Sequence, residues 1–357
     1  MSVQQLVNLC VVILVSVSGS VLADEYRSVG MQSLVVYSPS RQEDVSIKVW
    51  YPSSAMDAPI MTDTNRIFKG SRVLKEGPIA SGRYPLLVMS HGSGSNNDSM
   101  AWLATELSQS GFIVAAPNHP GTTTGDSTPI DTPKLWQRTD DLALVMTFLT
   151  DTWSSRDHLD STKIGVLGFS LGGAAALSLA GAKLNLDDYV HYCDKYPSMA
   201  DCHWFDSLIG YVDGKQVDMP PFELRSTDKG KFEQSNLDAR VRAAVLVDPS
   251  MAQAFELSRL RNNHRSMYFI NLGRSINVPV SVDATALSAA LPNGQLDHVL
   301  DATHFSFLPE CRDGAKAFLK KIGEEDRLCD DVGGRTRQDI HAELIQLIRS
   351  AFQRSLL

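Results

Sequence analysis

Residues 163–180 read KIGVLGFSLGGAAALSLA, an apolar run that passes through a G-x-S-x-G pattern into an alanine-rich run. The pattern predicts a buried strand over 163–169, a tight turn at Ser170 and a helix over 171–180. Both glycines are needed in such a turn because side chains flanking the serine would clash. The turn lifts the hydroxyl out of the sheet and over the helix N-terminus, whose dipole favours developing negative charge. The segment therefore predicts Ser170 as a nucleophile.

Apolar strands alternate with helices on both sides of this segment. An earlier strand, with Val45, Ile47 and Val49 on one face, alternates in polarity and is expected to be antiparallel and half-buried. Residues 53–82 are expected to form a loop. The alternation predicts the α/β class, with a mostly parallel central sheet covered by helices on both faces. The expected strands are 84–90, 111–117, 163–169, 242–247, 266–272 and 297–300, and the expected helices are 100–109, 134–149, 171–180 and 339–355.

The alternation breaks over residues 183–238, which are polar, contain cysteines and aromatic residues, and show no clear strand. A stretch this long within a compact domain usually has a function. We expect it to be a lid-like insertion over the strand ends in a single domain that runs from residue 24 to 357.

Composition and charge exclude one class of partner. The chain has 357 residues, of which 43% are hydrophobic, and a formal net charge of −8. The hydrophobic fraction is typical of globular proteins. Because no basic surface is expected to neutralise phosphates, nucleic acid is not an expected partner. A small molecule is the expected partner instead.

The first 23 residues resemble a signal peptide. Residues 6–22 are apolar, and Val21, Leu22 and Ala23 precede the polar residue Asp24 in the manner of a cleavage site. The segment before the apolar run contains neither lysine nor arginine, so an uncleaved membrane anchor is the alternative. We expect a mature chain that begins near Asp24, is periplasmic or secreted, and is not inserted in a membrane.

Cleavage there would remove Cys10 and leave four cysteines. In an exported protein, four cysteines suggest two disulfides with three possible connectivities. Proximity in sequence favours Cys193–Cys202 and Cys311–Cys329. The spacing does not match a zinc site, and no metal is expected.

An acyl-transfer serine needs N–H donors for the oxyanion of its tetrahedral intermediate. One donor is expected to be the backbone N–H of Leu171, directly after the serine. The other should come from the loop that follows the strand 84–90, where we predict the N–H of Ser93. His91, at the start of this loop, is expected to order it.

The general base should be a histidine after the last strand, since the chain order in this fold is serine, acid, histidine. His304 occupies that position. The predicted acid is Asp248, which directly follows the strand 242–247. The competing loop after residue 272 offers Asn277, which cannot supply a charge, and has no carboxylate before Asp283. Asp301 is close to His304 in sequence but is expected to lie on the wrong side of it.

These segments resemble those of bacterial dienelactone-hydrolase-like proteins related to platelet-activating factor acetylhydrolases, within the α/β-hydrolase superfamily. The resemblance implies a Ser-Asp-His triad with its aspartate after the sixth strand, in agreement with Asp248. It also implies hydrolysis of short-acyl esters without metal or cofactor. Dienelactone hydrolases proper use a cysteine nucleophile, so lactone chemistry is not expected here. The resembling segments are 89–94 (MSHGSG), 116–121 (APNHPG), 168–173 (GFSLGG), 247–249 (VDP) and 304–308 (HFSFL).

Two alternative functions remain on the same fold. One is an exported peptidase, for which no additional N-terminal domain of propeller size is found. The other is a non-catalytic binding protein, which the complete set of Ser170, Asp248 and His304 argues against. Four apolar residues are expected either to line an acyl pocket or to pack in the core: Trp102, Met251, Phe305 and Phe307.

Overall fold

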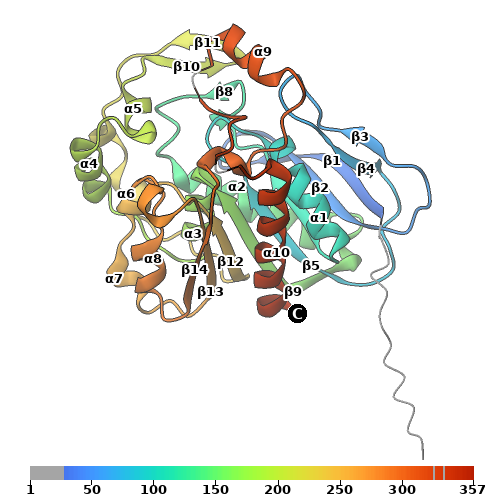
Figure 1. The fold of residues 1–357 in the computed structure, drawn as a ribbon. Helices are drawn as coiled ribbons and strands as arrows, with labels where there is room; N and C mark the ends of the chain where they lie inside the picture. The colour runs from blue at the N-terminus through green and yellow to red at the C-terminus, as the bar shows by residue number, and fades with distance from the viewer. Residues whose placement is uncertain (1–27, 325, 333) are drawn as a thin grey trace, which may run out of the picture.

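The computed structural model describes residues 28–324, 326–332 and 334–357. The predicted signal peptide, residues 1–23, lies outside them. A ten-stranded sheet crosses the molecule in the order β14-β13-β12-β9-β5-β6-β2-β1-β4-β3 (Figure 1). Its strands are β1 (Ser28–Ser38), β2 (Glu43–Ser53), β3 (Ile60–Thr62), β4 (Ser71–Lys75), β5 (Tyr84–Ser90), β6 (Ile113–Pro117), β9 (Leu159–Phe169), β12 (Val241–Val247), β13 (Ser266–Leu272) and β14 (Gly294–Val299).

The six strands from β14 to β6 in this order run parallel to their neighbours, whereas β2 is antiparallel to both β6 and β1. Helices cover both faces because the central strands are apolar on both sides. In β12, for example, Ala244 and Leu246 join one core cluster while Val245 and Val247 join the other. The predicted fold class is confirmed.

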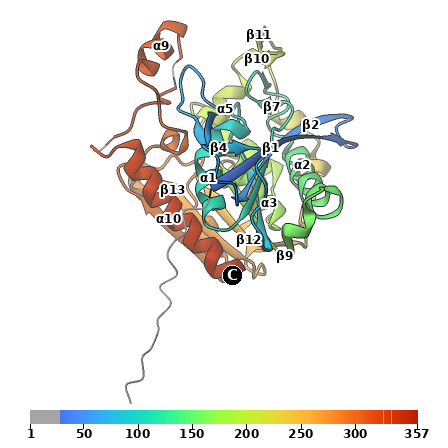
Figure 2. The same cartoon turned by 90° about the vertical axis from the view of Figure 1, so that its right-hand side faces the viewer.

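One face of the sheet packs against α1 (Ala101–Gln109) and α10 (Arg337–Leu356), and the other packs against α2 (Leu135–Thr147), α3 (Leu171–Leu179) and α8 (Thr285–Ala290). Figure 2 shows α10 and α2 on opposite sides of the sheet. The carboxyl ends of parallel strands meet along one edge of such a sheet, so the residues that follow β5, β9 and β12 come together there.

Three details differ from the sequence predictions. Residues 53–82 are not a loop throughout, because β3 and β4 form an antiparallel pair at the edge of the sheet. The strand β2 is half-buried, as predicted, only as far as Lys48: beyond it, Trp50 on the second face is completely buried against the other core cluster. The strand β1, for which no prediction was made, covers the outer edge of β2.

The insertion, residues 183–238, contains a hairpin as well as helices, so the prediction of no strand was wrong. Strands β10 (Ile209–Val212) and β11 (Lys215–Asp218) are joined by Asp213 and Gly214, both with positive φ, which is the signature of a tight two-residue hairpin turn. The pair extends a small sheet that includes β7 (Thr122–Thr123) and β8 (Asp126–Ser127). The helices are α4 (Leu186–Lys195), α5 (Ala200–Phe205) and α6 (Lys229–Phe232). The insertion lies above the main sheet in Figure 1.

Both expected disulfides are present. Cys193–Cys202 joins α4 to α5 within the insertion, and Cys311–Cys329 closes the segment before α10. Across the part of the chain that the structure describes, no helix has the length and apolar character needed to span a membrane.

Candidate active site

The turn between β9 and α3 holds Ser170 in a backbone conformation that most residues avoid. Its φ is 55° and its ψ is −122°. A Cβ on Gly168 would lie 2.0 Å from the carbonyl oxygen of Gly172, and one on Gly172 would lie 2.0 Å from the carbonyl oxygen of Ser90. Only glycine fits at both places, so the close packing of β9, α3 and the end of β5 forces the turn. A positive φ at a non-glycine residue costs on the order of 1–3 kcal/mol and is concentrated at functional sites.

Three side chains from separate segments form a hydrogen-bonded chain at this turn. The Nε2 atom of His304 lies 3.2 Å from the Oγ atom of Ser170, and its Nδ1 atom lies 2.9 Å from Oδ2 of Asp248. His304 begins a short 3-10 helix, η7 (His304–Phe307), after β14, while Asp248 directly follows β12. The structure thus brings together the three residues predicted as nucleophile, base and acid.

Asp248 is completely buried and its second carboxylate oxygen is also bonded. Oδ1 accepts hydrogen bonds from the backbone N–H of Leu272 and from the Nδ2 amide of Asn271, both at 2.9 Å. These two donors fix the orientation of the carboxylate, so that Oδ2 faces the imidazole. The imidazole itself is partly open to solvent, with 24% of the His304 side chain exposed. This arrangement would hold the hydrogen on Nδ1 and leave Nε2 free to accept a proton from Ser170.

The alternative acids have other contacts. Asp283 accepts a hydrogen bond from the backbone N–H of Thr285 at the start of α8. Asp301 lies 3.7 Å from the Arg274 guanidinium. Neither carboxylate has a hydrogen bond or ion pair with His304 among the described residues.

The two predicted oxyanion donors belong to two segments that adjoin the serine. Leu171 is the first residue of α3 and is buried. Ser93 belongs to the loop after β5, and a Cβ on its neighbour Gly92 would lie 3.3 Å from Cβ of Ser170. The loop backbone therefore passes directly beside the serine. His91 is completely buried, and its ring bonds to the backbone of this loop.

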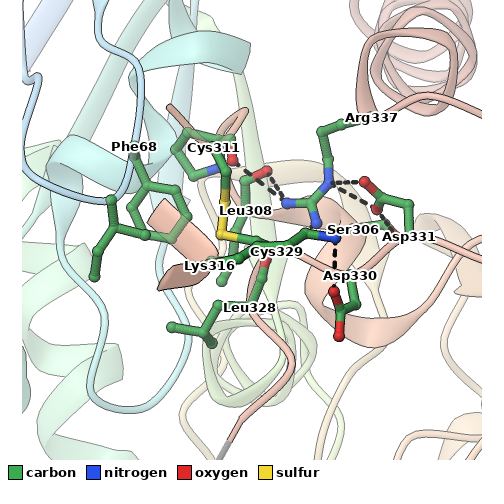
Figure 3. The surroundings of a disulfide bond; sticks show 12 residues. Phe68, Ser306, Leu308, Cys311, Lys316, Leu328, Cys329, Asp330, Asp331 and Arg337 are labelled. Carbon is green, nitrogen blue, oxygen red and sulfur yellow. Dashed lines mark hydrogen bonds and ion pairs between the residues drawn. A yellow bond between two sulfur atoms is a disulfide. The ribbon is translucent and has the colours of Figure 1, made fainter. Parts of the chain in front are cut away.

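A buried arginine, Arg337, binds the chain next to the segment that carries His304 (Figure 3). Ser306 donates to Asp331, and Arg337 binds the same carboxylate at 2.8 Å. Arg337 also donates to the carbonyl oxygens of Leu308, Pro309 and Leu328. Leu328 adjoins the Cys311–Cys329 disulfide, so one covalent link and one arginine hold together the chain that follows the histidine segment.

Aromatic rings complete this support. Phe169 stacks on Phe307 at 4.4 Å and lies 4.7 Å from the His304 ring. Trp102 stacks on His341 at 3.7 Å and meets Phe307 edge-on. Burial and the nearby Arg337 lower the pKa of His341 to about 4, so this ring is neutral near pH 7. Trp102 and Phe307 therefore pack in the core beneath the site.

One carboxylate of the insertion, Asp201 in α5, interacts electrostatically with the site. Burial raises the pKa of Asp201 in this helix, and the His304 imidazole is among the groups that lower it. Oδ1 of Asp201 accepts a hydrogen bond from the Tyr192 hydroxyl in α4, and the Cys193–Cys202 disulfide joins the residues next to these two. Asp201 of α5 therefore lies within electrostatic range of His304.

Sequence reasoning missed Arg138, which lies beneath the loop that carries Ser93. Its side chain is almost completely buried and donates to the backbone carbonyls of His91 and Gly92. A signal was present in the sequence, because Arg138 lies on the apolar stripe of α2 between Leu135 and Leu142. An arginine is seldom fully buried unless it is paired.

Comparisons with known proteins support the fold. Residues 84–190 match a family model described as serine aminopeptidase, S33. A bis(hydroxyethyl) terephthalate hydrolase from Streptomyces coelicolor is 27% identical over 135 residues, which cover 38% of this chain and 41% of that protein. Cutinase est1 from Thermobifida alba is 31% identical over 110 residues, 30% of this chain and 34% of that one. The alignments thus span less than half the length of either relative.

A solved structure resembles almost the whole chain. The ferulic acid esterase from Streptomyces cinnamoneus superposes with a TM-score of 0.60 at 17% sequence identity, covering 92% of this chain and 90% of that one. At this identity the likeness concerns the fold alone. With the order of the sheet and the sharp turn at Ser170, these findings show that the chain has an α/β-hydrolase fold.

Proposed function

We propose that the protein is an exported serine hydrolase that cleaves carboxylic esters of small molecules, with Ser170 as nucleophile, His304 as general base and Asp248 as the acid of the triad. The observation that carries the proposal is the continuous hydrogen-bonded chain from Asp248 through His304 to Ser170. The two disulfides support export, because such bonds persist in oxidising compartments.

In the proposed reaction, His304 takes the proton of the Ser170 hydroxyl as its oxygen attacks the ester carbonyl. The buried carboxylate of Asp248 stabilises the imidazolium that forms. Backbone N–H groups of Ser93 and Leu171 bind the oxyanion, and the imidazolium then gives its proton to the departing alcohol. Water, activated by His304, hydrolyses the acyl-enzyme and regenerates the serine.

The proposed substrate class follows from resemblances to other proteins. We propose that the chain is related to the dienelactone-hydrolase-like proteins that resemble platelet-activating factor acetylhydrolases. Short acyl groups are proposed as substrates from this resemblance. The two relatives named as a hydrolase of a terephthalate ester and as a cutinase support an ester as substrate. We further propose that the insertion acts as a lid and selects the substrate, since Asp201 of α5 lies within electrostatic range of His304.

Peptide hydrolysis is the second candidate, because the matching family model is described as a serine aminopeptidase. The test compares p-nitrophenyl esters of increasing acyl length with aminoacyl p-nitroanilides, using the wild-type protein and Ser170→Ala. The proposal predicts turnover of short-acyl esters that Ser170→Ala lacks. Preferential cleavage of the anilides would favour the peptidase, and equal ester turnover by both proteins would overturn the assignment of Ser170.

A further inference from the structure

A buried guanidinium holds the loop that passes beside Ser170. Arg138 extends from α2, and only 1% of its surface is exposed. Its Nη1 atom donates to the carbonyl oxygen of His91 at 2.6 Å, and its Nη2 atom donates to the carbonyl oxygen of Gly92 at 3.3 Å. Further donations go to the Oγ of Ser90 and to the hydroxyl and carbonyl oxygens of Thr122. Five hydrogen bonds to two segments, residues 90–92 and Thr122, fix the guanidinium plane.

The carbonyl of Gly92 and the N–H of Ser93 belong to the same peptide unit. This unit is planar and trans, so the C=O and N–H bonds point in opposite directions and rotate together. A group that fixes the oxygen of Gly92 therefore fixes the direction of the Ser93 N–H. Since Gly92 lies directly beside Ser170, this direction determines whether the N–H reaches the oxyanion.

A second donor holds the same carbonyl. Nε2 of His91 accepts a hydrogen bond from the backbone N–H of His119, so the hydrogen of the neutral ring must be on Nδ1. Nδ1 lies 2.7 Å from the carbonyl oxygen of Gly92 and donates to it. Burial, with Arg138 and His119 nearby, keeps the pKa of His91 well below its usual value and the ring neutral.

One carboxylate, Asp141, and a second cation, Arg41, lie in the same buried region as Arg138. Asp141, one turn along α2, accepts two hydrogen bonds from Arg41 and lies 2.8 Å from Nδ1 of His119. His119 in turn meets the hydroxyl of Ser90 through Nε2. Burial lowers the pKa of Arg138 to about 9, and the Asp141 carboxylate opposes this shift, so the guanidinium is charged at neutral pH. A charged donor on a carbonyl also polarises the peptide and strengthens the donation by its N–H.

We infer that Arg138 is a positioning residue of the oxyanion site: its fork, together with His91, holds the Gly92–Ser93 peptide so that the Ser93 N–H is directed at the oxyanion. The inference rests on the proposed function, in which Ser93 donates that hydrogen bond. Arg138 itself touches no reacting atom. Its loss should therefore weaken binding of the transition state without weakening binding of the uncharged substrate.

The test uses Arg138→Met, which keeps the length of the side chain and removes the fork, and Arg138→Lys, which keeps the charge but cannot hold two adjacent carbonyls in the same way. Arg240→Met is the matched control, because Arg240 also donates to a carbonyl at α2, that of Ala143, but lies away from the loop. For each protein, kcat and KM are measured with one p-nitrophenyl ester, together with Ki for a trifluoromethyl ketone, whose adduct with serine carries an oxyanion.

Removal of an oxyanion donor lowers kcat by about 10²–10³. In Arg138→Met the Ser93 N–H is misdirected but still present, so the loss should be near the smaller value. We therefore expect kcat to fall by about 10²-fold and KM to change less than threefold. The Ki of the ketone should rise in proportion to the fall in kcat/KM. Arg138→Lys should lose about tenfold, and Arg240→Met should match the wild type.

The outcomes distinguish a failure of the proposed function from a failure of the role inferred for Arg138. A wild-type protein without esterase activity would overturn the proposed function and this inference with it. An active wild type in which Arg138→Met folds, with kcat and Ki unchanged, would overturn the inference alone, even if its melting temperature is lower. If Arg138→Met does not fold, Arg138→Lys decides: wild-type kcat and Ki in that variant would contradict the inference.

Discussion

Replacing Asp248 by asparagine should nearly abolish turnover while leaving the fold intact. Asparagine tolerates the left-handed backbone found here, where φ is 42°. The donors Leu272 N–H and Asn271 Nδ2 at Oδ1 require an oxygen at that position, so the NH₂ of the new amide must face His304. An NH₂ donor forces the imidazole to accept at Nδ1 and to carry its hydrogen on Nε2. This tautomer cannot take the proton of Ser170.

The same tautomer change lowers kcat by about 10⁴ in the best-studied serine triad, which corresponds to about 5 kcal/mol of barrier. We expect a loss of that order for Asp248→Asn, measured with a p-nitrophenyl ester at saturating concentration. Asp283→Asn and Asp301→Asn are the controls and should keep wild-type kcat. Chemical denaturation should show similar stability for all four proteins. If Asp248→Asn retains more than a tenth of wild-type kcat, the proposed arrangement of donors around the carboxylate is wrong.

Three further predictions concern stability and the insertion. Gly172→Ala should lower the free energy of unfolding in urea by about 3 kcal/mol or more, because its Cβ would meet the backbone at the end of β5. Gly230→Ala is the control and should lower it little, since its Cβ would make only an ordinary contact. Equal stabilities of the two variants would contradict the packing of the turn. Reducing or deleting the insertion disulfide should change the ratio of kcat/KM for long against short acyl esters by at least fivefold, and an unchanged ratio would argue against a lid. Burial keeps the pKa of His91 and of His119 well below 6.5 and lowers that of His341 to about 4, so at these three rings the unfolded chain binds more protons below pH 6.5; Asp141, whose pKa burial raises to about 6, offsets one of them, and stability should still fall as the pH is lowered from 6.5 to 4, whereas a rise would refute the buried neutral rings.

The parts of the fold that could be predicted from sequence are those with a short-range signature. The G-x-S-x-G turn depends on neighbours four residues apart, and each central strand is an apolar run because both of its faces are buried. Asp248 could be chosen because it directly follows such a strand. The order of the strands in the sheet then places Asp248 beside His304.

What escaped prediction depends on contacts between distant segments. Strands β3 and β4 lie at the exposed edge, where little apolar surface is buried and the pattern is weak. The hairpin β10–β11 was missed although Asp213-Gly214 is a strong turn signal, because its flanking strands carry little apolar alternation. Arg138 was visible as a charge on an apolar stripe, but the two loop carbonyls that it binds, those of His91 and Gly92, lie more than forty residues away in the sequence.

The central claim is that Ser170 is the nucleophile of an ester hydrolase. The most direct measurement is covalent labelling with a fluorophosphonate, followed by peptide mass spectrometry and a parallel ester assay. We predict one adduct per chain on the peptide that contains Ser170, loss of hydrolysis in step with labelling, and neither label nor activity in Ser170→Ala. Stoichiometric labelling at another residue, or ester turnover that survives full modification of Ser170, would contradict the account.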